Sequence, residues 1–132
     1  NQMNTYKDRI KNAGLRLTRQ RLALGKMLFE AGPRHLTAET FYDEARVNGI
    51  EVSLATIYNT LHQFRDAGLL RQVHVDNSRS YFDTNVSDHH HFFLEDEGKL
   101  VDIPSEGIRV EGLPTAPDGR QINSVDVIVR LK

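Results

Sequence analysis

The spacing of apolar residues changes at Gly68, and this change most constrains the fold of the chain. Before Gly68, apolar residues recur at intervals of three and four, which is the period of one face of an α-helix. After it, residues 69–75 and 79–83 alternate on either side of a polar turn, which predicts a β-hairpin. Helices followed by such a hairpin predict a winged helix, the extended form of the helix-turn-helix.

Each of the three main predicted helices begins at a residue whose side-chain oxygen can cap it. Thr18 begins a helix that runs to about residue 30, and Thr37 begins one that ends at Asn48-Gly49. Ser53 begins the third, which ends before Gly68. A weaker helix, with fewer apolar anchors, is predicted over residues 4–12.

The last third of the chain predicts a small sheet. Residues 89–94, 99–103 and 123–131 have the composition of strands, and the Pro- and Gly-rich segment 104–119 leaves room only for short helices. A sheet of three strands buries little core, so we expect it to dimerise. The predicted fold class is α+β, with an N-terminal winged helix-turn-helix domain over residues 1–84 and a small C-terminal α/β dimerisation domain over residues 85–132.

Charge is distributed unevenly along the chain. Residues 1–35 carry a net charge of +6 and residues 86–132 carry −4, which suggests that a polyanion docks on the first segment, although an ordinary solvated helical surface has the same composition. The lack of cysteine excludes disulfides, thiolate zinc sites, iron–sulfur clusters and a cysteine nucleophile. With no long apolar run and no signal-peptide pattern, we expect a cytoplasmic protein without a membrane partner.

The helix that begins at Ser53 has a polar face opposite its apolar face. Asn and Gln side chains can pair with adenine, and Thr can meet a thymine methyl group, so this face predicts contact with base edges in double-stranded DNA. An amphipathic helix with a solvent face is the alternative. The predicted contacts on the helix are Thr56, Tyr58, Asn59, Thr60 and Gln63, and the candidates for phosphate or minor-groove contacts are Arg16, Arg19 and Arg21.

A histidine cluster opens the C-terminal segment. Alternation along a strand puts His89 and His91 on one face and Asp88 and His90 on the other, so the first pair can bind one metal ion. Further ligands are available in His35, Asp83 and Asp102. Without sulfur, iron, manganese, zinc and cobalt all remain possible. A small metalloenzyme is the alternative, but we find no clear general base or phosphate-binding loop and predict that the chain is not an enzyme.

The chain resembles the ferric uptake regulator family along nearly its whole length. The matching motifs are Gly14–Arg21, His35–Glu39, Leu54–Tyr58, Gln63–Leu69, Tyr81–Asp83, and His89-x-His91 followed by Gly98-Lys99. The resemblance implies a homodimeric winged-helix regulator that binds operator DNA, with Tyr58 and Arg16 among the usual DNA contacts. It also implies a metal-sensing site formed by His35, Asp83, His89, His91 and Asp102.

Two features set the chain apart from many members of that family. Where many members have a Cys-x-x-Cys pair for structural zinc, residues 94–97 are Leu-Glu-Asp-Glu, so no Cys-ligated zinc is expected. The consecutive histidines, the missing cysteines and the Val-Asp-Val-Ile-Val-Arg ending are most similar to the iron response regulator (Irr) branch of rhizobia and relatives. That branch implies haem sensing, here by His89, His90 and His91.

The predicted function is a sequence-specific DNA-binding transcriptional regulator, expected to be a repressor, that responds to iron or haem status. Its cofactor would be a divalent metal ion (Fe, Mn or Zn), haem, or both. A peroxide-sensing metal-dependent repressor of the same family is the alternative, since an acid of the Asp83 type is also what peroxide-sensing members use.

Overall fold

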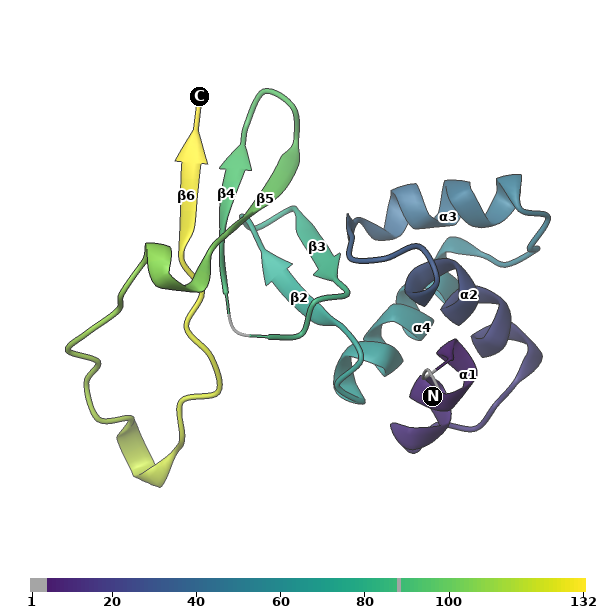
Figure 1. Ribbon diagram of the computed structural model, residues 1–132, viewed down its shortest axis with the longest axis horizontal. Helices are drawn as coiled ribbons and strands as arrows, with labels where there is room; N and C mark the ends of the chain where they lie inside the picture. The colour runs from purple at the N-terminus through teal and green to yellow at the C-terminus, as the bar shows by residue number, and fades with distance from the viewer. Residues whose placement is uncertain (1–4, 88) are drawn as a thin grey trace. The chain divides into compact units, whose positions relative to one another are not determined.

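The computed structural model describes residues 5–87 and 89–132, and Asp88 therefore lies outside the described residues. The chain forms two compact units that divide between Val86 and Ser87 (Figure 1). The first unit holds four helices and a small sheet, and the second holds a second small sheet. This confirms the predicted α+β class. Among the described residues, no helix has the length and hydrophobicity needed to cross a membrane.

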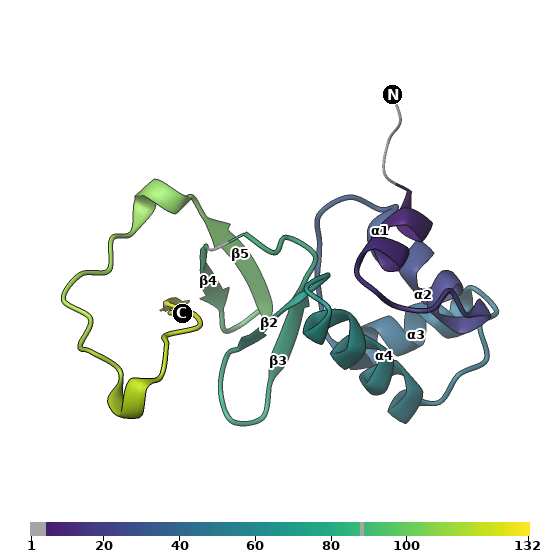
Figure 2. The same ribbon diagram turned by 90° about the horizontal axis from the view of Figure 1, so that it is seen from below.

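The four helices are α1 (Tyr6–Asn12), α2 (Arg19–Phe29), α3 (Ala38–Val47) and α4 (Leu54–Asp66). α1 packs on α2 and α3 packs on α4 (Figure 2). The predicted caps are confirmed: Thr18, Thr37 and Ser53 each accept a hydrogen bond from the backbone N–H three residues further on, at 3.1, 3.1 and 3.0 Å. A cap of this kind contributes about 1 kcal/mol to helix stability.

Gly68 ends α4 as the sequence predicts. Its φ of 83° lies in the left-handed region that glycine adopts at little cost, and the chain there turns back so that the Leu69 N–H donates to the Phe64 carbonyl at 2.8 Å. The turn leads directly into the hairpin of β2 (Arg71–His74) and β3 (Ser80–Asp83), which pair antiparallel.

A third strand that the sequence did not predict joins this hairpin. β1 (His35–Leu36) pairs antiparallel with β3, and the strand order is β1-β3-β2. A segment of two residues is too short to show the alternation of a strand, so the sequence does not predict β1. Its register sets His35 opposite Asp83.

The helices and the hairpin share one hydrophobic core. Its fully buried aromatic residues are Phe41, Phe64 and Phe82, from α3, α4 and β3. Burying a large apolar side chain of this kind contributes roughly 1.5–3 kcal/mol. The four helices precede the β2–β3 hairpin, as the sequence predicts for a winged helix, and β1, which lies between α2 and α3 in the chain, joins this hairpin beside β3.

One part of the prediction for α4 is wrong. Thr60, expected on the polar face, is only 5% exposed, whereas the apolar Leu54 at the first position of α4 is 36% exposed. The buried stripe runs through Ile57, Thr60 and Phe64, together with Leu61, at the i, i+3, i+4, i+7 spacing of one helix face. The stripe therefore starts at Ile57 rather than at Leu54, and Thr60 falls inside it.

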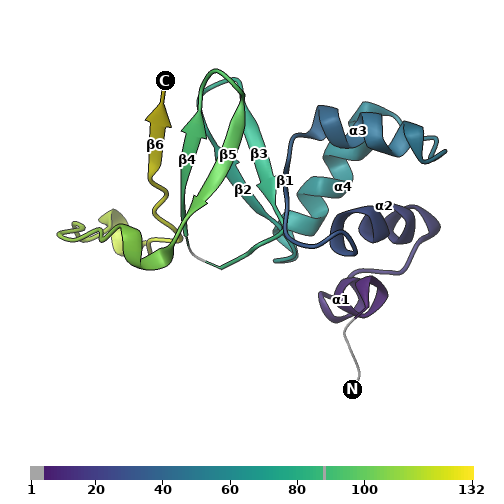
Figure 3. The same ribbon diagram turned by 45° about the horizontal axis from the view of Figure 1, so that its top comes forward.

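The C-terminal unit is built on β4 (His90–Leu94), which lies between β5 (Lys99–Ile103) and β6 (Ile128–Leu131) (Figure 3). β5 pairs antiparallel with β4 and β6 pairs parallel with it. The loop from β5 to β6 contains only two single-turn 3₁₀ helices, Ser105–Gly107 and Pro117–Gly119, which confirms that helices in this segment are short.

The third strand of this sheet is shorter than predicted. Residues 123–127 do not belong to β6, which begins at Ile128. The reason lies at Val127, whose N–H donates to the imidazole Nδ1 of His90 at 3.0 Å instead of joining the backbone ladder. The Val127 carbonyl accepts from the His91 N–H at 3.2 Å, so the ladder starts at this point.

Candidate functional site

The first candidate ligand pair lies in the N-terminal unit. Cross-strand neighbours in antiparallel sheets are close enough for their side chains to meet, and the register of β1 and β3 brings His35 Nε2 to 3.0 Å from Asp83 Oδ2. Asp83 is 1% exposed, and its Oδ1 accepts the Asn85 N–H at 2.8 Å. A carboxylate buried to this degree is stable only with such partners.

A second group of candidate ligands lies in the C-terminal unit. His91 stands opposite Asp102 in the register of β4 and β5, and His89 precedes β4 on the same side. The Nε2 atoms of His89 and His91 lie 3.1 and 3.3 Å from the same Asp102 oxygen. The two rings are 4.5 Å apart between centroids, and both histidines are buried, at 7% and 1% exposure.

The hydrogen bond of His89 Nδ1 determines whether its other ring nitrogen, Nε2, carries a proton. His89 Nδ1 lies 2.7 Å from the Ser87 carbonyl oxygen, and because that oxygen can only accept, Nδ1 carries the proton and donates. In the neutral ring, Nε2 then has a lone pair and no proton, and it faces Asp102 Oδ1 at 3.1 Å. Such a contact is stable only with a positive charge between the two atoms, either a proton or a metal cation.

The distances within each group fit ligands that share one ion. Ligand atoms bound at about 2.0–2.2 Å lie roughly 3.0–3.5 Å from one another in tetrahedral or octahedral geometry. The His35–Asp83, His89–Asp102 and His91–Asp102 separations are 3.0, 3.1 and 3.3 Å. Since the donors are imidazoles and carboxylates without sulfur, they suit Fe, Mn or Zn.

The three predicted haem ligands are not brought together. His90 lies on the face of β4 opposite His91, because strand side chains alternate. Its Nδ1 already accepts the N–H of Val127, so this ring holds β6 against β4. Of the three, His89 and His91 lie together beside Asp102, and His90 lies apart from them.

Most of the predicted DNA-contact residues are accessible. Asn59 and Gln63 on α4 are exposed, as are Arg16, which lies ahead of α2, and Arg19, the first residue of α2. Thr56 and Tyr58 are half-buried. Thr60 is withdrawn from the predicted set because it is buried in the core stripe of α4.

Two of these side chains have partners that the sequence did not reveal. Arg21 donates from Nε and Nη2 to the Gln63 side-chain oxygen at 3.3 and 3.0 Å. The Tyr58 hydroxyl donates to a Glu39 carboxylate oxygen at 2.6 Å, and this bond raises the pKa of Tyr58 above its usual value. These partners are 42 and 19 residues apart in the chain, so no local pattern could have indicated them.

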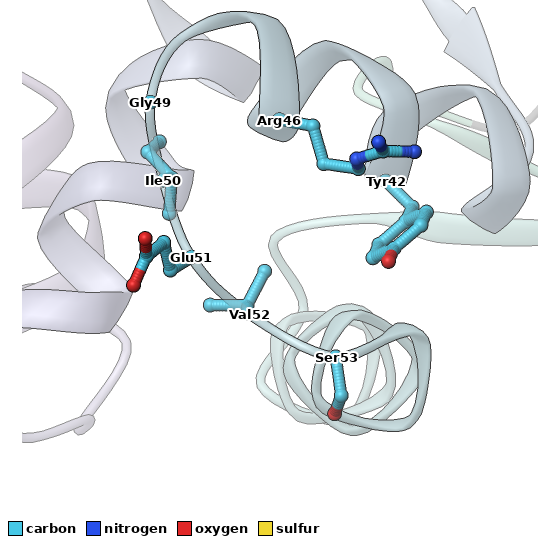
Figure 4. A pocket seen from close by; sticks show the side chains of 7 residues that line it. All are labelled: Tyr42, Arg46, Gly49, Ile50, Glu51, Val52 and Ser53. Carbon is cyan, nitrogen blue, oxygen red and sulfur yellow. The ribbon is translucent and has the colours of Figure 1, made fainter.

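A hollow of about 540 Å³ lies where α3 leads into α4. Figure 4 shows the loop from Gly49 to Ser53 along one side of the hollow, with Tyr42 and Arg46 of α3 on the other. The Arg46 guanidinium lies 5.7 Å from the centre of the Tyr42 ring. None of the predicted ligand or DNA-contact residues lines this hollow.

The sequence matches known proteins over most of its length. Residues 12–129 match the sequence profile of the ferric uptake regulator family. The ferric uptake regulation protein of Vibrio anguillarum is 33% identical over 107 residues, which cover 80% of this chain and 72% of that protein. A peroxide-responsive repressor of Staphylococcus saprophyticus is 38% identical over 94 residues, which cover 71% of this chain and 63% of the repressor, less than two thirds of its length.

The fold matches solved structures as well. The ferric uptake regulator of Pseudomonas aeruginosa, solved with manganese, is similar with a TM-score of 0.72 and 26% identity, and the match covers 97% of each chain. The Vibrio cholerae ferric uptake regulator has a TM-score of 0.73 at 24% identity, over 97% of this chain and 99% of that one, and shows likeness of fold.

Proposed function

Because the chain belongs to the ferric uptake regulator family of metal-responsive transcriptional regulators, we propose that it is a DNA-binding repressor controlled by a divalent metal ion. The observation that carries the proposal is the arrangement of His89 and His91, whose Nε2 atoms meet at one Asp102 oxygen. An enzymatic role is not part of the proposal, since the similar proteins are named as regulators.

The proposed metal ligands are the five residues that the resemblance to the family implies. His35 and Asp83 come from the N-terminal unit, and His89, His91 and Asp102 come from the C-terminal unit. What supports this is that each group on its own has the spacing of atoms that share an ion. If both groups bind the same ion, metal would restrict the motion of one unit relative to the other. The affinity for operator DNA would then depend on the metal concentration.

DNA recognition is assigned to the exposed face of α4 and to the basic residues ahead of α2. We expect Tyr58→Ala or Asn59→Ala to weaken binding to the cognate site by roughly 1–3 kcal/mol and to relax its selectivity. Arg16→Ala should weaken binding to all sequences more evenly and make its salt dependence shallower. Fluorescence anisotropy on specific and random duplexes at several salt concentrations measures both effects.

Unchanged operator affinity in these variants would contradict the assignment. If folded Tyr58→Ala and Arg16→Ala variants keep the operator affinity of the wild type, DNA binds elsewhere. Val47→Ala is a suitable control, because Val47 is 88% exposed at the end of α3 and lies outside the proposed face.

We propose that the protein is a homodimer joined through the C-terminal unit, without Cys-ligated zinc. Among the described residues of that unit, only Phe93, Leu100 and Ile103 are buried apolar side chains. The sheet face opposite His91 and Asp102 carries the cross-strand row Phe92, Val101 and Val129, and Val101 is 38% exposed. A small core beside an open apolar face favours association with a second copy.

The dimer proposal predicts that Val101→Asp weakens self-association by at least about tenfold, because a charge would be buried in the interface. Sedimentation velocity over a range of concentrations measures the dissociation. Val47→Asp adds the same charge to an exposed apolar residue of the N-terminal unit and should leave the dimer intact. Exhaustive chelation should also leave it intact, and dissociation on chelation would show that metal holds the dimer.

A narrower proposal is that the chain belongs to the iron response regulator branch and that haem is its signal. The resemblance in the consecutive histidines and the missing cysteines supports it. The hydrogen bond of His90 to Val127 and the burial of His91 weigh against a haem held by all three histidines. We therefore favour an ion as the ligand, and titration with haemin against Fe(II) and Mn(II), followed by absorption and DNA binding, separates the two signals.

Peroxide sensing is the second candidate. The 38% identity to a peroxide-responsive repressor and the contact of His35 with the buried Asp83 favour it. A peroxide-sensing member oxidises a ligand histidine beside Fe(II). Mass spectrometry of the Fe(II)-loaded protein after peroxide would then find an added oxygen atom on His35, His89 or His91, and unmodified histidines would exclude this mode.

A further inference from the structure

The amide of Gln63 is held in one orientation by Arg21. We propose that this contact makes Gln63 a hydrogen-bond donor toward DNA, so that it selects a keto base, guanine or thymine, over an amino base at one position of the operator. The inference rests on the proposed DNA-binding function and narrows it to the chemistry of one contact.

The orientation follows from the chemistry of the guanidinium group. Arg21 has only N–H donors, so the Gln63 atom that faces it must be the amide oxygen. Two donors, Nε at 3.3 Å and Nη2 at 3.0 Å, meet that oxygen, which has two lone pairs. A third, Nη1, donates to the Arg16 carbonyl at 3.0 Å and ties the guanidinium to the chain ahead of α2.

The occupied oxygen changes what Gln63 can read. The usual pairing of Gln with adenine needs the amide oxygen to accept from the adenine amino group while the NH₂ donates to N7. With both lone pairs taken by Arg21, the group left for DNA is the NH₂. Freeing the oxygen would break two hydrogen bonds that Arg21 donates to it, which disfavours the adenine contact.

A donor distinguishes bases by the group at the major-groove edge. Guanine presents O6 and N7, and thymine presents O4, all of which accept hydrogen bonds. Adenine shares the N7 acceptor but has an amino group where guanine has O6, and cytosine has an amino group where thymine has O4. A Gln63 NH₂ placed at that group meets it donor to donor. We therefore expect a preference of roughly tenfold for guanine or thymine at the contacted position. Arg21 acts here as a positioning residue rather than as a phosphate contact.

The sharpest test is Gln63→Glu. The carboxylate keeps an acceptor for Arg21 and replaces the NH₂ donor with a second acceptor, so the preference at this position should invert toward adenine or cytosine. Operator duplexes are first selected by the wild-type protein from random DNA, and each base pair is then replaced by the other three. Anisotropy gives the affinity ratios, in which a general loss from the added negative charge cancels.

A matched control lies on the hairpin. Arg65 Nη1 donates to the Gln72 side-chain oxygen, so Gln72→Glu makes the same chemical change in another Arg–Gln pair. It should leave every base preference unchanged. Arg21→Met frees the Gln63 oxygen and should raise affinity for adenine at the contacted position, provided thermal unfolding shows an intact fold.

The outcomes separate this inference from the function on which it rests. A wild-type protein that selects no sequence from random DNA overturns the proposed function. A protein that selects a site, but whose base preferences do not change in Gln63→Glu, overturns only the role of Gln63. An inversion that also occurs in Gln72→Glu would show that the charge, and not the contact, determines the preference, and it too overturns the inference.

Discussion

Replacing both His89 and His91 by alanine is expected to reduce metal affinity by at least about 100-fold and to abolish the response of DNA binding to metal. These two imidazoles supply both nitrogen ligands of the C-terminal group, and a carboxylate alone is a poor site for Fe, Mn or Zn at neutral pH. Loss of even an outer hydrogen-bond partner of a ligand typically costs 10–100-fold in affinity. Isothermal titration with Mn(II) and anisotropy with operator DNA measure the two effects.

The same variant distinguishes sensing from folding. Its dimerisation and its salt-dependent binding to random DNA should match those of the wild type, since neither depends on the ligand nitrogens. His74→Ala provides a histidine control, because His74 is exposed on β2 and its Nδ1 bonds Ser80 rather than a candidate ligand. A double variant that still responds normally to metal and to haemin would place the sensor in another part of the chain.

Local signals predicted the helices of this protein well. The caps at Thr18, Thr37 and Ser53 involve hydrogen bonds to residues three positions away, so the sequence contains the whole interaction. The same locality let the alternation of His89 and His91 predict that they share a side. Both conclusions need only the geometry of one helix or one strand.

These local patterns do not predict contacts between segments that are distant in the sequence. β1 exists because two residues pair with β3, and only this pairing brings His35 to Asp83. The burial of Thr60 depends on which side of α4 the neighbouring helices cover, and a threonine fits either side of an amphipathic pattern. The resemblance to a family predicts His35 and Asp102 as ligands, whereas spacing alone offers them only as candidates.

Metal binding in the wild type is expected to slow amide hydrogen exchange in both units. A ligand present at 100 times its dissociation constant stabilises the form that binds it by about 2.7 kcal/mol, which corresponds to roughly 100-fold slower exchange through openings that release the ligand. If His35 and Asp83 join the ligands of the C-terminal unit, this protection covers β3 as well as β4 and β5. Hydrogen-exchange mass spectrometry with and without Mn(II) resolves these strands.

Asp83→Asn should confine that protection to the C-terminal unit. The amide keeps an acceptor for the Asn85 N–H but lacks the charge that a cation needs. Metal should then no longer slow hydrogen exchange in β3, while it still slows exchange in β4 and β5. Asp76→Asn, on the exposed turn of the same hairpin, removes a carboxylate that bonds Arg79 instead and should preserve the wild-type pattern.

Thermodynamic linkage limits how metal binding can affect the N-terminal unit. An ion can shift an equilibrium of the N-terminal unit only through differential affinity for its states, and a ligand in that unit is the direct source of such affinity. Protection of β3 that survives Asp83→Asn would show coupling by another route, and wild-type protection limited to β4 and β5 would show that the C-terminal ligands bind metal alone. Only protection of both units that depends on Asp83 agrees with the proposed ligand set, in which metal would control the helix proposed to bind DNA.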